Sequence, residues 1–126
     1  MPTSDIRTDT LVVCLCAAWC GSCRDYRATF NEVRERFEST HAGLRFLWVD
    51  IEDESDLVDP LDVENFPTLL IASGSAPRFF GAVTPQPETL ARIVLAHLPS
   101  EAGLITLPDP DLHRVVTRLR QHLSPE

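Results

Sequence analysis

Long hydrophobic runs, internal repeats and a basic surface are all missing from this chain of 126 residues. No apolar stretch approaches the ~20 residues of a bilayer-spanning helix, so we expect no membrane insertion. The start, MPTSDIRTDT, lacks a basic segment followed by an apolar one, so no secretory signal is indicated and we expect a cytoplasmic protein. The net charge of −8 disfavours nucleic-acid binding, because phosphate contacts need a basic patch.

The acidic excess is confined to one stretch of the chain. Residues outside 50–64 carry 11 acidic and 11 basic side chains, whereas residues 50–64 carry eight acidic and no basic ones. A solvated surface is the simpler interpretation, and docking of a basic partner is the alternative. The eight residues are Asp50, Glu52, Asp53, Glu54, Asp56, Asp59, Asp62 and Glu64.

Cysteines are not scattered along the chain as in a disulfide-rich secreted domain. All four lie between positions 14 and 23. With 44% hydrophobic and 24% charged residues, the chain has the composition of an ordinary globular domain that needs no such staples. The clustering therefore indicates a local chemical site.

The hydrophobic pattern predicts alternating strands and helices. Strands are expected at Leu11–Ala17, Leu44–Ile51, Thr68–Ala72 and Arg78–Ala82, the last two joined as an antiparallel hairpin by Ser73-Gly74-Ser75. Helices are expected after the segment AWCGSC as far as Ser39–Gly43, over Ser55–Val63 with an interruption near Pro60, over Pro87–Leu98, and from Pro110 onward. This order predicts a three-layer α/β arrangement.

The pair Cys20 and Cys23 is the predicted catalytic group. A Cys-x-x-Cys segment between a strand and a helix places its first cysteine at the helix N-terminus, where free N–H groups and the dipole favour a thiolate. Cys23, one turn later, can attack a mixed disulfide formed at Cys20. Trp19 is expected to shield the pair and to offer an apolar surface to a partner.

Other roles for the four cysteines are disfavoured. A zinc or iron–sulfur site would need all four thiolates. We expect Cys14 and Cys16, on a strand buried on both faces, not to converge with Cys20 and Cys23. Cys14 and Cys16 are interpreted as small buried hydrophobic residues, so neither a metal nor another cofactor is expected.

The segment WCGSC, the apolar strand before it and Phe66-Pro67-Thr68 together resemble the thioredoxin family over about residues 11–98. The resemblance implies a three-layer α/β/α fold with a central mixed sheet of about four strands. It also implies a cis peptide bond before Pro67, which would pack against the cysteines, with Phe66 offering backbone groups to an extended substrate. An ordinary strand-entry proline is the alternative at Pro67. Gly81 matches a family glycine that lets substrate approach, or else marks a simple bulge.

Several positions depart from the family pattern. Gly21-Ser22 replaces Gly-Pro between the cysteines, so we expect a less reducing pair than a typical thioredoxin. Cys14 and Trp48 replace a buried aspartate and its lysine neighbour, which removes both charges together. Cys16 replaces a tryptophan. Only 19 residues precede Cys20, which predicts a shortened N-terminus.

Two regions and two functions are predicted. Residues 1–99 are expected to form the thioredoxin-like domain, and residues 100–126 an extension whose amphipathic helix packs on it; a partner-binding face is the alternative for that helix. The first function is a monomeric protein-disulfide oxidoreductase that acts on protein disulfides and takes electrons from a thioredoxin-reductase-like donor. The second is a binding module or chaperone for one partner protein, with weak redox activity.

Overall fold

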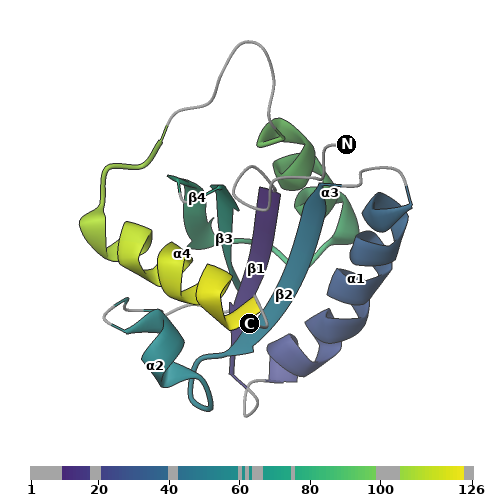
Figure 1. Cartoon of the computed structure of the whole chain (residues 1–126). Coiled ribbons are helices and arrows are strands. Elements are labelled where there is room, and N and C mark those ends of the chain that lie inside the picture. The colour runs from purple at the N-terminus through teal and green to yellow at the C-terminus, as the bar shows by residue number, and fades with distance from the viewer. Residues whose placement is uncertain are drawn as a thin grey trace.

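The computed structural model describes residues 10–17, 21–39, 43–59, 61, 63, 67–74, 76–98 and 106–123. These residues form four strands and four helices, in the chain order that the hydrophobic pattern predicts (Figure 1). In chain order they are β1 (Thr10–Cys16), α1 (Gly21–Glu38), β2 (Leu44–Asp50), α2 (Ser55–Val58), β3 (Thr68–Ser73), β4 (Ala76–Ala82), α3 (Pro87–Ala96) and α4 (Pro110–Leu123).

The strands form one mixed sheet in the order β2-β1-β3-β4. β1 pairs in parallel with β2 and antiparallel with β3, and β3 pairs antiparallel with β4. The predicted hairpin is confirmed, and Gly74 at its turn has a φ of 58°, a conformation that glycine adopts without a steric penalty. β1 is central, and all seven of its residues are buried, as expected of a strand covered on both faces.

Each face of the sheet is covered by its own helices (Figure 1). Even-numbered β1 residues pack with α1 and α3 in a cluster that includes Phe30 and Val94. Odd-numbered β1 residues pack with α2 and α4 in a second cluster that includes Val58 and Leu119. This is the predicted three-layer α/β/α arrangement, and its two clusters follow from the two-residue period of a strand.

Two boundaries differ from the sequence-based expectation. α1 begins at Gly21, so the glycine and serine between Cys20 and Cys23 belong to the helix. α2 ends at Val58, five residues earlier than expected, and Asp59 has an extended backbone with ψ of 137°. Asp59 precedes Pro60, and the residue before a proline disfavours the helical conformation, so the helix stops there.

Polar contacts attach α4 to two loops as well as to the sheet. Arg118 donates to the backbone carbonyl of Asp56 within α2 and to that of Asp59, the residue that follows the helix. Arg120 donates through Nε to the carbonyl of Gly74 in the hairpin turn, at 2.9 Å. These contacts hold α4 across the sheet, in addition to its buried apolar stripe.

No helix in the described part of the chain combines the length and the hydropathy that a membrane crossing requires.

Candidate functional site

The N-terminus of α1 carries the inner cysteine of the predicted pair. Cys23 is the third residue of the helix and is 1% exposed, with its side chain directed at the sheet. The first turn of α1 contains no acidic residue, so no side-chain carboxylate offsets the positive end of the helix dipole. Trp19 and Cys20 lie outside the described residues, as does the side chain of Ser22, and the thiolate expected at Cys20 stays a prediction.

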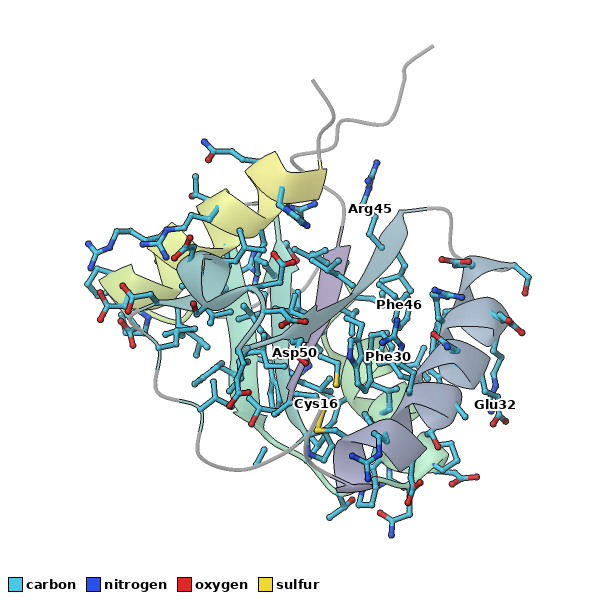
Figure 2. All side chains as sticks on the ribbon, turned by 90° about the horizontal axis from the view of Figure 1, so that it is seen from below. Cys16, Phe30, Glu32, Arg45, Phe46 and Asp50 are labelled. Carbon is cyan, nitrogen blue, oxygen red and sulfur yellow. A yellow bond between two sulfur atoms is a disulfide. The ribbon has the colours of Figure 1, made fainter. Side chains whose placement is uncertain are left out.

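Cys23 forms a disulfide with Cys16, the last residue of β1, with the two Cα atoms 5.7 Å apart (Figure 2). The interpretation of Cys16 as an inert hydrophobic residue is therefore wrong. Cys16 is at the end of the strand that leads toward the helix, and its side chain is on the face that α1 covers. The sequence reasoning used the apolar run correctly but overlooked that its alternation aims Cys16 at the first turn of α1.

Cys14 completes a cluster of three sulfur atoms. Its Sγ lies 3.7 Å from Sγ of Cys16, on the same face of β1. Cys16 carries no hydrogen in the disulfide, so Cys14 is the donor of this S–H···S contact. The expectation that Cys14 and Cys16 would not converge with Cys23 is thus wrong, although no group of three or more potential metal ligands is found among the described residues.

Burial controls the ionisation of this cluster. It raises the pKa of the Cys14 thiol well above its ordinary value, and the nearby positive charge of Arg27 offsets only part of that shift. Burial also raises the pKa of the Tyr26 hydroxyl, with a further contribution from Cys14. Both groups therefore remain neutral donors at physiological pH. The Tyr26 hydroxyl is buried and finds no hydrogen-bond partner in the described part of the chain.

The guanidinium of Arg27 lies near Trp48, the position where the family pattern would place a lysine. Trp48 pairs in register with Cys14 on the neighbouring strand. Arg27 of α1 lies over the Trp48 ring, with Cζ 4.9 Å from the ring centroid. The positive charge thus comes from the helix, a contact that the sequence reasoning missed because it joins residues 21 positions apart.

A pocket of about 520 Å³ opens beside Cys23. Its lining residues include Cys23, Arg24, Arg27 and Trp48. The lining also includes three carboxylates of the acidic stretch: Asp50, Asp53 and Glu54. Asp50 begins that stretch, and its Oδ1 accepts the backbone N–H groups of Glu52 and Asp53 at 2.9 and 3.2 Å. The pocket therefore combines charges of both signs and borders Cys23, whose side chain is itself buried.

The predicted substrate-binding residues are only partly described. Pro67 is buried, and its carbonyl accepts the N–H of Val83 at 3.0 Å. Thr68 opens β3 and is also buried. Phe66 lies outside the described residues, so its role and the cis bond before Pro67 stay predictions.

Gly81 is not a bulge. It pairs with Leu69 in regular register, and the register shift falls between Ile71 and Ala72 instead. A Cβ at position 81 would lie 3.7 Å from the Phe79 ring, an ordinary contact, so the fold itself does not require glycine there.

Comparisons with known proteins identify the family of this chain. The family model described as Thioredoxin matches residues 3–94. Thioredoxin H2-1 of Oryza sativa subsp. japonica is 31% identical over 67 residues, which is 53% of this chain and 46% of that protein. Thioredoxin-1 of Caenorhabditis elegans is 33% identical over 54 residues, which is 43% of this chain and 44% of that protein. The chain thus spans less than half the length of these curated relatives.

The fold is also found among solved structures. The germline-specific thioredoxin protein Deadhead of Drosophila melanogaster superposes with a TM-score of 0.62 at 17% identity. The match covers 73% of this chain and 84% of that one. At this identity the likeness concerns the fold alone.

Proposed function

Because the chain belongs to the thioredoxin family, we propose that it reduces or exchanges protein disulfides through Cys20 and Cys23. The family and the adjoining sulfur atoms of Cys16 and Cys23 support thiol–disulfide chemistry in general. The pair that performs it, the protein substrates and a thioredoxin-reductase-like electron donor are parts of the proposal.

In the proposed reaction, the Cys20 thiolate attacks one sulfur of a substrate disulfide. A mixed disulfide forms, and the other substrate sulfur leaves as a thiolate. Cys23 then attacks the sulfur of Cys20, the Cys20–Cys23 bond forms, and the substrate departs with two electrons. The donor later returns those two electrons to the oxidised pair.

The position of Cys23 carries this proposal. Cys23 lies in the first turn of α1, three residues after Cys20 in the sequence, and it is among the residues that line the pocket. The fold leaves room for a side chain at position 81, so packing does not explain the glycine there. Close approach of a substrate segment to the backbone would explain it.

A binding module is the second candidate, and one observation favours it. With Cys23 bonded to Cys16, no resolving thiol is available to release a partner held at Cys20. A chain fixed in that state would retain a partner protein instead of turning it over.

Turnover with a disulfide-containing protein substrate separates the two candidates. The wild-type chain should catalyse repeated reduction by a dithiol, the Cys20→Ser variant should be inactive, and Cys23→Ser should accumulate mixed disulfides. Single-turnover capture without catalysis by the wild type would support the binding module. Failure of Cys23→Ser to form any mixed disulfide would contradict the oxidoreductase.

A further inference from the structure

We propose that Cys16 is a third redox cysteine, which takes the disulfide from the Cys20–Cys23 pair and stores it as the buried Cys16–Cys23 bond. The inference rests on the proposed function in one respect: that function supplies the Cys20–Cys23 disulfide. Its geometric basis is independent, because Cys16 and Cys23 are bonded in the structure.

The transfer is a disulfide exchange at Cys23. The Cys16 thiolate attacks Sγ of Cys23, the Cys16–Cys23 bond forms, and the Cys20–Cys23 bond breaks with its electron pair on Cys20. The proton that Cys16 loses is matched by the one that Cys20 can take up. Nothing is oxidised or reduced overall, so the step needs no external oxidant.

Cys16 is positioned for this exchange by β1. Cys16 and Cys23 are each 1% exposed, so the bond that they share is withdrawn from solvent, whereas Cys23 also lines the pocket. Once the packing around this bond opens locally, a reducing thiol in the pocket would attack Cys23 as the electrophile, because Cys23 and not Cys16 is among the lining residues. Cys16 is then the leaving group and departs into the protein interior.

A leaving sulfur in the interior needs a donor, and Cys14 supplies one. Its S–H lies 3.7 Å from Sγ of Cys16 and is kept protonated by burial. The Tyr26 hydroxyl belongs to the same core cluster but makes no hydrogen bond to these sulfur atoms, so Cys14 is the donor that the structure shows at Cys16. Cys14 is thus a positioning residue that favours the anionic form of Cys16.

The exchange changes what the protein does. With the disulfide at Cys20–Cys23 the chain has completed a turnover. With the disulfide at Cys16–Cys23, Cys20 is a free thiol and Cys23 cannot resolve a mixed disulfide, so a captured partner is held. Oxidising conditions, by forming the Cys16–Cys23 disulfide, would therefore convert the protein from a catalyst into one that retains its partner as a mixed disulfide.

Disulfide mapping of the full chain tests the assignment. The Cys20→Ser variant, equilibrated in glutathione buffers and quenched with acid, should contain a Cys16–Cys23 peptide. The double variant Cys16→Ala/Cys20→Ser is the matched control and should show only mixed disulfides with glutathione. Free Cys16 in the Cys20→Ser variant at every glutathione ratio would overturn the proposal.

Wild-type mapping does not depend on a variant folding. After oxidation by a protein disulfide, the Cys20–Cys23 peptide should appear first and the Cys16–Cys23 peptide should grow at its expense. Absence of the second peptide would overturn the transfer. If the chain forms the Cys16–Cys23 bond but does not turn over a substrate, the proposed function would be contradicted, whereas the assignment of Cys16 as a redox cysteine would still stand.

The role of Cys14 has its own readout. Reduction of the Cys16–Cys23 bond in the Cys20→Ser background should slow by about two- to tenfold in Cys14→Ala, the loss expected for one hydrogen bond. Cys14→Ser keeps a donor and should restore most of the rate. Equal rates for the two variants would overturn the donor role.

Discussion

Position 14 shows how a buried charge can be removed without leaving an unpaired partner. Cys14 is fully buried, and its neighbour across the sheet, Trp48, carries no charge either. A carboxylate there would incur a desolvation cost of several kcal/mol without a close cation on β2. The neutral thiol avoids that cost, and the positive charge of Arg27, which acts on Cys14, lies over the Trp48 ring.

The raised pKa values of Cys14 and Tyr26 predict a loss of stability in alkali. In the folded chain both groups keep their protons above the ordinary values of about 8.5 and 10, whereas in the unfolded chain they lose them. The unfolded state then binds fewer protons, so the free energy of unfolding falls as pH rises, by ~1.4 kcal/mol per pH unit for each group. The stabilisation is complete below about pH 8.5.

Urea unfolding between pH 8 and 10, without reductant, measures this effect. The slope of unfolding free energy against pH between 8.5 and 10 should be shallower in Cys14→Ala by ~1.4 kcal/mol per unit. Tyr26→Phe should leave the slope between pH 8.5 and 10 nearly unchanged, because the tyrosine hydroxyl of the unfolded chain ionises mainly above about pH 10. Identical slopes in wild type and Cys14→Ala would contradict the buried neutral thiol.

Serine at position 22 predicts a less negative reduction potential for the Cys20–Cys23 pair than that of a typical thioredoxin. Serine lacks the restriction that proline places on the turn and adds a hydroxyl donor, which favours the reduced form. We expect a potential at least ~30 mV less negative than the −270 mV of thioredoxin, and a return toward that value in Ser22→Pro. The measurement is glutathione equilibration read on the Cys20–Cys23 peptide, with Ser22→Ala as control. A wild-type potential at or below about −270 mV would contradict the expectation.

Residue-scale reasoning from sequence reached Cys23 but not its bonded partner. The spacing of Cys20 and Cys23 is a local pattern, so its chemistry could be predicted without a fold. The partnership of Cys16 with Cys23 depends on how far the end of β1 lies from the first turn of α1, a tertiary distance. Strand alternation already placed Cys14 and Cys16 on one face, which was the available signal.

At the scale of elements, local chemistry predicted the hairpin and the helix positions well. Gly74 supplies the positive φ of the β3–β4 turn, and Pro87 begins α3 where proline is favoured. The interruption predicted near Pro60 is confirmed, since α2 ends at Val58, but the expected continuation to Val63 is wrong because the backbone restriction before Pro60 stops the helix. Steric rules at one peptide bond outweighed the periodic pattern.

Helix α4 is expected to contribute strongly to stability. Its apolar stripe is buried against odd-numbered residues of β1, and Leu119 is 0% exposed. Leu119→Ala should lower the free energy of unfolding by about 2–5 kcal/mol, the cost of a core cavity. Thr117→Ala on the exposed side of the same helix is the control and should change it by less than about 0.5 kcal/mol. A loss below about 1 kcal/mol for Leu119→Ala would contradict the packing of α4 in the core.

At the scale of the whole molecule, the sheet separates the sulfur cluster on one face from the apolar packing of α2 and α4 on the other. One face, covered by α1 and α3, holds the sulfur cluster and the aromatic contacts of Phe30 with Phe46 and Trp48 (Figure 2). The other face, covered by α2 and α4, contains no cysteine among its described core residues. Stability can therefore be altered from the second face while the chemistry is read on the first.

The charge distribution follows the same division. The pocket beside Cys23 combines two arginines of α1 with carboxylates that follow β2, so the acidic stretch borders the reactive face. Docking of a basic partner on the acidic stretch stays a prediction. The sequence shows the acidic stretch, and the structure shows that three of its carboxylates line the pocket beside Cys23.

The central claim is that the N-terminus of α1 stabilises a sulfur anion at Cys20. The most direct measurement is the rate of Cys20 alkylation by iodoacetamide in the reduced full chain, followed by peptide mapping from pH 4 to 10. We expect a titration midpoint for Cys20 at or below about pH 7.5, within the range of cysteines at helix N-termini. A midpoint near 8.5, that of free cysteine, would contradict it.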